Sequence, residues 1–225
     1  MAAVKTAQRL KLAVLISGEG SNLQAILDAC SSGVLPADVG AVISNRADAR
    51  GLRRALAAHV PVHTIIATSG TARDDYDTAL RILIERHAPQ LILLAGFMRI
   101  LSDDFVRHFR GRLLNIHPAL LPKFRGLYTH RRVLAAGEHE HGCSVHFVTE
   151  ELDGGPVIAQ AKVAVKADDT EQTLAARVRQ REHALYPLVV RWFAEDRVRL
   201  GANHVLFDGQ PLSTPRVFEI NEEIA

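Results

Sequence analysis

The first hundred residues alternate short apolar runs with longer amphipathic stretches, and this alternation limits the folds open to the chain. The apolar runs lie at 12–16, 39–44, 60–66 and 91–95, and the stretches with helical spacing lie at 21–32, 48–58 and 72–87. The run LILLA at 91–95 is continuously apolar, as expected of a strand covered on both faces. The pattern predicts a mostly parallel central sheet with flanking helices, built from right-handed strand–helix–strand units.

The second half of the chain departs from this rhythm. A short run at 113–116 leads into a loop with two prolines and a glycine. Segments 144–149 and 157–165 predict mixed or antiparallel additions to the same sheet. A helix is expected at 170–194, where Pro187 is expected to cause a kink. Residues 197–200 and 205–207 predict a terminal hairpin.

Composition is that of an ordinary globular protein. The 225 residues are 48% hydrophobic and 23% charged, which provides enough apolar material for a core. The net charge is +2, with acids and bases mixed along the chain, so neither nucleic acid nor an anionic membrane is an expected partner. We see no internal repeat or linker, and we expect one α/β domain over 1–225.

Neither cysteine usage nor hydropathy points to secretion or to a membrane. Cys30 and Cys143 are the two cysteines, and neither belongs to a zinc or dithiol motif. No apolar run approaches the roughly 18 residues of a membrane span. The segment MAAVKTAQRL is too polar for a secretory signal. These features lead us to expect a cytoplasmic protein.

A glycine-rich turn, SGEGSN at 17–22, joins the first expected strand to its helix. Gly18 and Gly20 allow a sharp turn, and Ser21 with Gln24 fits a capping box. Free amides and the helix dipole make such a turn an anion site. The third glycine of the dinucleotide motif and the lysine of a Walker A motif are both missing. A single phosphate is the expected ligand, and the alternative is a turn that serves geometry alone.

Polar side chains that suit acyl transfer follow the run at 113–116. Asn115 and His117 are two residues apart, so in a strand they face the same side, at the end where parallel sheets bind ligands. An asparagine amide can donate to an oxyanion, and histidine exchanges a proton near neutral pH. Asp153, in ELDGGP, can orient the imidazole. The alternatives are a structural histidine and an Asx-turn at Asp153.

Other polar clusters carry weaker signals. Residues 138–141, EHEH, lack the helical spacing of a metalloprotease motif, and we expect a solvated turn without metal. Cys143 has His146 nearby, but it has no helix N-terminus to activate a thiolate. His130 and the two arginines after it are expected to open a helix with a solvated basic face.

Four segments together resemble a known family. They are LISGEGSNLQAI (15–26), LAGFMRIL (94–101), LLNIHPALLP (113–122) and GCSVHFVTEELDGGPVI (142–158). The sequence is similar to the folate-dependent formyltransferases that act on glycinamide ribonucleotide in purine biosynthesis, in their monofunctional bacterial form. The resemblance runs from residue 12 to about residue 200. It implies a Rossmann-like formyltransferase fold, with antiparallel strands in the C-terminal half.

The resemblance also implies site residues and substrates. The catalytic residues would be Asn115, His117 and Asp153. Residues that would bind the acceptor, N1-(5-phospho-D-ribosyl)glycinamide (GAR), are Gly20, Ser21, Asn22, Arg179, Gln180, Arg181 and Glu182. Residues that would bind 10-formyltetrahydrofolate are Arg73, Met98, Arg99, Ile100, Leu101, Asn115, Thr149, Glu150, Glu151, Leu152 and Asp153. The chain would divide into an N-terminal extension at 1–11, a phosphate-binding half at 12–110, and a catalytic and folate-binding half at 111–225.

The implied reaction is direct transfer without a metal. The acceptor amine would attack the formyl carbon, Asn115 and protonated His117 would stabilise the oxyanion, and Asp153 would keep His117 protonated. Partners would be the two small molecules, and the protein would be a monomer or a homodimer.

The loop after NIHP departs from the family pattern. Ala119 stands in place of serine, Arg125 in place of proline, and Tyr128 in place of histidine. The phenol of Tyr128 can still form hydrogen bonds, but it cannot carry the charge of an imidazole.

Three alternatives stay open from the sequence. A 10-formyltetrahydrofolate hydrolase shares this chemistry, but it would have an N-terminal regulatory domain, whereas the glycine loop here begins by residue 17. A formyltransferase for an aminoacyl-tRNA or a sugar amine is the second, and the tRNA enzyme would need a basic C-terminal domain. A non-catalytic Rossmann-like binding module is the third.

Overall fold

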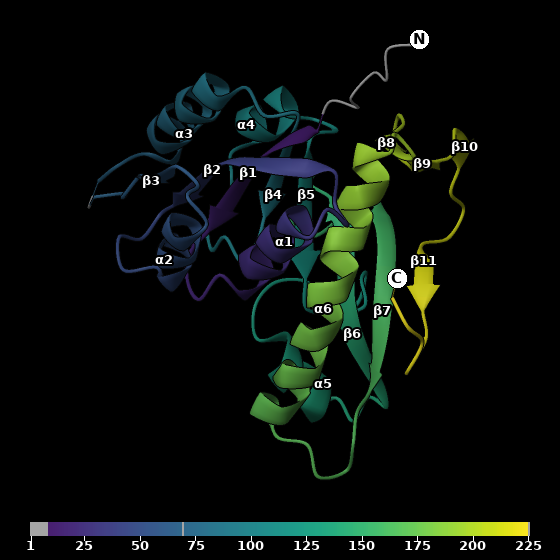
Figure 1. Cartoon of the computed structure of the whole chain (residues 1–225). Coiled ribbons are helices and arrows are strands. Elements are labelled where there is room, and N and C mark those ends of the chain that lie inside the picture. The colour runs from purple at the N-terminus through teal and green to yellow at the C-terminus, as the bar shows by residue number, and fades with distance from the viewer. Residues whose placement is uncertain (1–8, 69, 225) are drawn as a thin grey trace.

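A mixed sheet runs through the protein, and helices cover both of its faces (Figure 1). This computed structural model describes residues 9–68 and 70–224. The strands of the sheet are β1 (Leu10–Ile16), β2 (Ala37–Ser44), β3 (Val62–Thr64), β4 (Leu91–Leu94), β5 (Leu113–His117), β6 (Glu140–Phe147), β7 (Val157–Ala164) and β11 (Arg216–Phe218). Their order across the sheet is β11-β7-β6-β5-β4-β1-β2-β3.

Six helices and a small second sheet complete the described part of the chain. The helices are α1 (Ser21–Ser31), α2 (Arg50–Ala57), α3 (Arg73–His87), α4 (Asp103–His108), α5 (Thr129–Ala135) and α6 (Glu171–Ala194). The second sheet contains β8 (Val198–Leu200), β9 (Val205–Phe207) and β10 (Gln210–Pro211), paired antiparallel. The terminal hairpin predicted from the sequence is therefore confirmed.

Strand directions confirm the predicted fold class. The pairs β1–β2, β1–β4, β2–β3 and β4–β5 are all parallel, whereas β6 runs antiparallel to both β5 and β7. The parallel neighbours that follow one another in the chain are joined through helices, as parallel pairs require, and the antiparallel strands β6 and β7 are joined by a loop. The fold is α/β, with a mostly parallel sheet and antiparallel strands in the C-terminal half.

Two apolar layers pack against the sheet, one on each face. In β1, Leu12, Val14 and Ile16 point into the layer beneath α1, α2 and α6, and Ala13 and Leu15 point into the layer beneath α3 and α4. All five side chains are fully buried. Because alternate residues of a strand face opposite sides, burial on both faces requires the continuous apolar runs seen in the sequence.

A buried tyrosine fixes α6 against the strands that carry the candidate site. The Tyr186 hydroxyl lies 3.2 Å from the Leu94 carbonyl of β4 and 3.0 Å from the Leu114 carbonyl of β5. Its single proton can be shared between the two oxygens, one at the last residue of β4 and the other at the residue before Asn115 in β5. Tyr186 therefore links α6 to the edge of the sheet where Asn115 lies.

Some local predictions were wrong. The first strand begins at Leu10, so Leu10 and Lys11 belong to the sheet instead of the expected extension, whose residues 1–8 lie outside the described part. The capping box at Ser21 does not form, because Gly20 is the cap residue of α1 in the left-handed conformation (φ 71°) and has no side chain to donate or accept. The predicted helix at 170–194 is confirmed as α6, which continues through Pro187.

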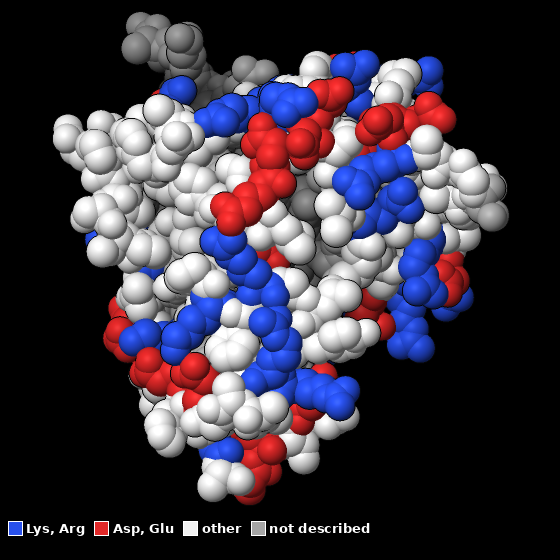
Figure 2. Space-filling model, turned by 180° about the vertical axis from the view of Figure 1, so that it is seen from behind, with Lys and Arg blue, Asp and Glu red and all other residues white. Residues whose placement is uncertain are grey.

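Charges are mixed on the surface, as in the sequence. On the face seen in Figure 2, acidic side chains lie directly beside a band of basic ones. Among the residues that the structure describes, no helix has the length and apolar character needed to span a bilayer.

Candidate active site

The candidate site lies where β5 and β6 run side by side. Leu113, Asn115 and His117 share one face of β5, since they are two residues apart. Leu113 is buried in the layer beneath α3 and α4, and the two polar residues continue this face beyond that layer. On β6, His146 lies directly opposite Asn115 in the antiparallel register.

Four side chains meet there. The Asn115 Nδ2 atom lies 3.1 Å from His146 Nε2. The Asp153 carboxylate approaches both histidines, with Oδ2 3.5 Å from His117 Nδ1 and Oδ1 3.8 Å from His146 Nε2. The side chains of His117 and Asp153 are only 7% and 9% exposed, so water screens their charges little. The structure thus brings Asn115, His117 and Asp153, the three predicted catalytic residues, into one buried cluster.

Asp153 is held by a distant part of the chain. Its Oδ2 atom accepts a hydrogen bond of 2.8 Å from the amide of Gly126, 27 residues away. Its backbone is left-handed (φ 49°), a conformation that asparagine and aspartate tolerate better than most residues. This contact contradicts the Asx-turn alternative, in which the carboxylate would bind only neighbouring backbone.

His146 is a member of the cluster that sequence reasoning missed. Its Nδ1 atom lies 2.9 Å from the Phe147 carbonyl, so Nδ1 carries a proton and Nε2 is left to accept from Asn115 Nδ2. Burial lowers the pKa of His146 to about 4, which keeps it neutral at neutral pH. The interaction fixes the Asn115 amide and leaves its second Nδ2 proton free. Only the β5–β6 register, which the sequence does not specify, could have revealed this role.

His117 has an oxygen beside each ring nitrogen. Its Nε2 atom lies 3.0 Å from the Phe124 carbonyl, and its Nδ1 atom faces Asp153. A carbonyl can only accept, so Nε2 must carry a proton to form this bond. With Nδ1 also protonated, the ring would be an imidazolium between a carbonyl and a carboxylate. The arrangement is therefore suited to holding positive charge.

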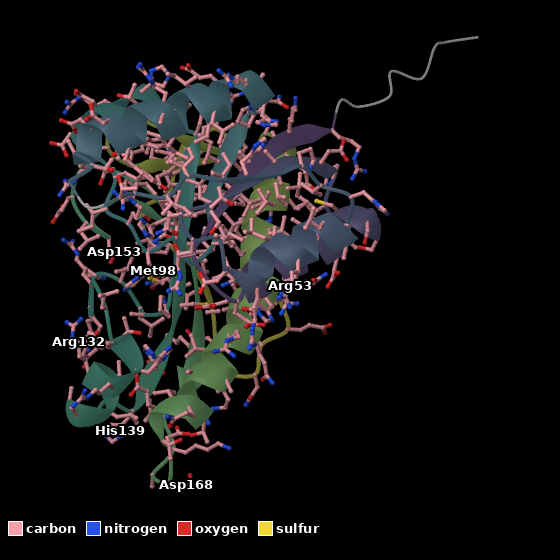
Figure 3. All side chains as sticks on the ribbon, turned by 90° about the vertical axis from the view of Figure 1, so that its left-hand side faces the viewer. Arg53, Met98, Arg132, His139, Asp153 and Asp168 are labelled. Carbon is pink, nitrogen blue, oxygen red and sulfur yellow. The ribbon has the colours of Figure 1, made fainter. Side chains whose placement is uncertain are left out.

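A cavity of about 120 Å³ opens beside this cluster. Its walls are Leu94, Phe97, Arg99, Ile100, Leu101, Val106, Asn115, His146, Val148, Thr149, Glu150, Glu151, Leu152 and Asp153. Of the predicted folate-binding residues, Met98 and Arg73 are not in these walls. Met98 is 66% exposed and is seen on the same side of the molecule as Asp153 in the view of Figure 3, and Arg73 is exposed at the start of α3. The Arg99 guanidinium stacks 3.9 Å from the centre of the Tyr76 ring.

The glycine-rich turn has the geometry of an anion site. Two facts require glycine at position 20. Its φ is positive, and a Cβ there would lie 2.5 Å from the Gly51 Cα. The amides of 21–23 open α1 and have no partner within the helix. Ser17 links the turn to the loop after β4, because its Oγ accepts from the Met98 amide at 2.7 Å. The loops that follow β1 and β4 are therefore fixed to each other.

One contact connects the turn to α6. Asn22 Nδ2 donates to the Glu182 carboxylate at 2.9 Å. Glu182 is 8% exposed, and burial raises its pKa. Among the other predicted residues of α6, Arg179 and Gln180 are exposed, whereas Arg181 binds carbonyls of the C-terminal segment at Phe218, Glu219 and Glu222. The structure thus places Glu182 at the turn and gives Arg181 a different partner.

The histidine-rich segment at 138–141 differs from its prediction. His141 belongs to β6, is 1% exposed, and lies 2.9 Å from His130 Nδ1. The prediction of a solvated turn is wrong for His141, because α5 covers the start of β6 there. Within residues 9–68 and 70–224, no group of three or more histidine, cysteine or acidic side chains is arranged to hold a metal ion. Burial raises the pKa of Cys143, which does not favour a thiolate nucleophile.

The buried histidines predict how stability depends on pH. Burial is the main cause that lowers the pKa of His141 to about 3 and that of His146 to about 4, from an ordinary 6.5. Between pH 6.5 and 4 the unfolded chain takes up protons that the folded protein does not, so the free energy of unfolding must fall as pH falls. At one unit below 6.5 the loss is about 1.4 kcal/mol for each histidine. The raised pKa of Glu182 has the opposite effect on the free energy of unfolding. The stability that Glu182 contributes falls as pH rises above 4.5, so it increases as pH falls.

Urea unfolding at pH 7 and pH 5.5 measures this loss. His141→Gln is expected to reduce the difference between the two pH values without abolishing it, because His87, His130, His146 and His183 also have lowered pKa values. His139→Gln, at an exposed position, is expected to leave the difference unchanged. A free energy of unfolding that is equal at both pH values in the natural sequence would contradict the burial of neutral histidines.

Comparison with known proteins agrees with this geometry. Residues 10–190 match the family model described as formyl transferase. The chain is 56% identical over 203 residues to phosphoribosylglycinamide formyltransferase of Escherichia coli, covering 90% of this chain and 96% of that protein. The solved phosphoribosylglycinamide formyltransferase of Coxiella burnetii superposes with a TM-score of 0.90 at 50% identity, over 93% of this chain and 99% of that one.

A more distant structure belongs to a hydrolytic relative. Formyltetrahydrofolate deformylase of Burkholderia mallei superposes with a TM-score of 0.82 at 27% identity, and it covers 89% of this chain but 70% of its own. Identity and coverage are both higher for the Escherichia coli and Coxiella burnetii phosphoribosylglycinamide formyltransferases. With a family model that spans residues 10–190, this chain belongs to the formyl transferase family.

Proposed function

We propose that this protein transfers the formyl group of 10-formyltetrahydrofolate to the amine of GAR, giving formyl-GAR and tetrahydrofolate on the route to IMP. The observation that carries the proposal is the buried cluster of Asn115, His117 and Asp153 beside a cavity. The high identity to the Escherichia coli enzyme supports the choice of substrates. The proposed partners are these two small molecules, without nucleic acid, and the proposed location is the cytoplasm.

In the proposed reaction, the GAR amine attacks the formyl carbon and a tetrahedral oxyanion forms. The free Nδ2 proton of Asn115 and the Nε2 proton of His117 donate to it, after the formyl oxygen takes the place of the Phe124 carbonyl. Each such donor is typically worth about 3–4 kcal/mol. The intermediate collapses as the bond to the folate nitrogen breaks, the amine loses a proton, and that nitrogen gains one. Asp153 stabilises the imidazolium throughout.

The proposed substrate positions follow from the surroundings of the cluster. The phosphate of GAR binds the amides of Gly20, Ser21 and Asn22, and Glu182 lies beside the acceptor. The folate enters the cavity lined by 99–101 and 149–153.

Acceptor-dependent turnover tests the proposal. Purified protein is expected to release tetrahydrofolate only when GAR is present. With the GAR analogue that lacks the 5′-phosphate, KM for the acceptor is expected to be at least about 100-fold higher, because charge-assisted hydrogen bonds to the phosphate are lost. Spectrophotometric release of tetrahydrofolate measures both effects. Release without any acceptor would instead indicate a hydrolase, and no release under any condition would favour a binding module.

A further inference from the structure

A short segment, 124–126, lies between the two charged members of the cluster. The carbonyl of Phe124 binds His117 Nε2 at 3.0 Å, and two residues later the amide of Gly126 donates to Asp153 Oδ2 at 2.8 Å. His117 and Asp153 are thus connected in two ways: through hydrogen bonds to the same three-residue segment, and directly, with 3.5 Å between His117 Nδ1 and Asp153 Oδ2. The position of this segment therefore affects the geometry of both side chains.

Arg125, in the middle of the segment, reaches the turn that carries Asp153. Its Nη1 atom forms an ion pair with Glu151 Oε1. The Glu151 side chain crosses over Gly154, where an added Cβ would lie 2.4 Å from the carboxylate. The amide of Gly154 also donates to the Glu151 carbonyl at 3.0 Å, so the turn is closed at this point. The glycine leaves the room that the ion pair needs.

The other side of the segment is anchored to α5. Arg132 Nη1 donates to the Arg125 carbonyl at 2.6 Å, and its guanidinium lies 5.5 Å from the centre of the Phe124 ring. Of the two partners of Arg125, α5 is a regular helix, while the turn at 149–154 has no secondary structure that would hold it. The ion pair is thus a side-chain link from an anchored segment to a turn that has no helix or strand of its own.

We propose that Arg125 is a positioning residue for formyl transfer: through Glu151 it holds the turn at 149–154 so that Asp153 faces His117. The inference rests on the proposed function. The side chains of Arg125 and Glu151 are 37% and 66% exposed, so the pair is screened by salt and its contribution is modest.

Variants of Arg125 test the proposal. Arg125→Ala is expected to lower kcat about three- to five-fold, the range for an exposed ion pair, and to leave KM for GAR unchanged because the phosphate site lies elsewhere. Raising salt should lower the activity of the natural protein towards that of the variant and should change the variant little. Lys123→Ala is the matched control, since it removes another ion pair of the same loop, to Glu138 at 2.9 Å. It is expected to behave as the natural sequence does.

Charge reversal separates positioning from a merely structural role. Arg125→Glu is expected to be slower than Arg125→Ala, and the double variant Arg125→Glu with Glu151→Arg is expected to recover at least half of that loss. Activity of Arg125→Ala equal to that of Lys123→Ala, or no recovery in the double variant, would overturn the proposal.

Hydrogen exchange without substrates tests the same link independently of activity. Amides at 149–155 are expected to exchange faster in Arg125→Ala than in Lys123→Ala or the natural protein, with unfolding midpoints unchanged. Equal exchange in all three would overturn the proposal. Hydrogen exchange still tests the link if formyl transfer itself is not observed. If the natural protein is active and Arg125→Ala has the same kcat, the proposal for Arg125 fails and the proposed function stands.

Discussion

Replacing Asp153 by asparagine is expected to lower kcat roughly 10³-fold while the protein still folds. The amide oxygen of asparagine can continue to accept the Gly126 amide, which bonds Asp153 Oδ2 at 2.8 Å. What is lost is the negative charge 3.5 Å from His117 Nδ1, and with it the stabilisation of an imidazolium in a buried site. Steady-state kinetics with both substrates saturating measures the effect on kcat.

Asp168→Asn is the matched control, because it removes a carboxylate that is exposed and lies at the lower tip of the molecule, well away from Asp153 (Figure 3). It should keep full activity. If Asp153→Asn were folded and as active as the control, the carboxylate would have no part in the reaction. Unfolding curves in urea for both variants check that any loss is not a loss of folded protein.

Removing the amide of Asn115 is expected to have the second largest effect. Asn115→Ala should lower kcat about 10²- to 10³-fold with little change in either KM, since an oxyanion donor acts mainly in the transition state. Asn115→Asp should be no better, because a carboxylate cannot donate to an oxyanion or to the neutral His146 Nε2, 3.1 Å from the Asn115 amide.

Gln172→Ala provides the control for Asn115, as it removes an exposed side-chain amide from α6. A loss confined to KM, with kcat unchanged in Asn115→Ala, would mean that Asn115 binds the substrate in its ground state and does not stabilise the oxyanion. Kinetics over a matrix of both substrate concentrations separates these two results.

Most of the fold could be predicted because its signals are local. Runs such as the one that forms β1 are apolar on both faces, and only a sheet covered on both sides buries them completely. Antiparallel strands in the C-terminal half were likewise predicted and are confirmed, but the pairing of β6 with both β5 and β7 is seen only in the structure. Three elements escaped prediction: α4, which has only 6 residues, β10, which has 2, and β11, which adds to β7 at the edge of the sheet. None of them is long enough to show a period.

The candidate site could be predicted only in part. Strand geometry placed Asn115 and His117 on one face, and the structure confirms this. Asp153 was assigned to the site only from family resemblance. Its contact with Gly126 connects two parts of the chain that no local sequence pattern relates. His146 was missed since its role depends on the register between β5 and β6. The cap at Gly20 was missed because the sequence Gly20–Ser21 is compatible both with a left-handed glycine cap and with a serine cap.

Transfer of a labelled formyl group tests the central claim most directly. The natural protein would be given 10-formyltetrahydrofolate with a ¹³C-labelled formyl group, together with GAR, and the label would be followed by NMR. If formyl transfer occurs at the cluster of Asn115, His117 and Asp153, all of the label appears in formyl-GAR, in step with tetrahydrofolate, and Asp153→Asn slows its appearance by the same factor as kcat. Label released as free formate, or equal rates in Asp153→Asn and Asp168→Asn, would contradict the claim.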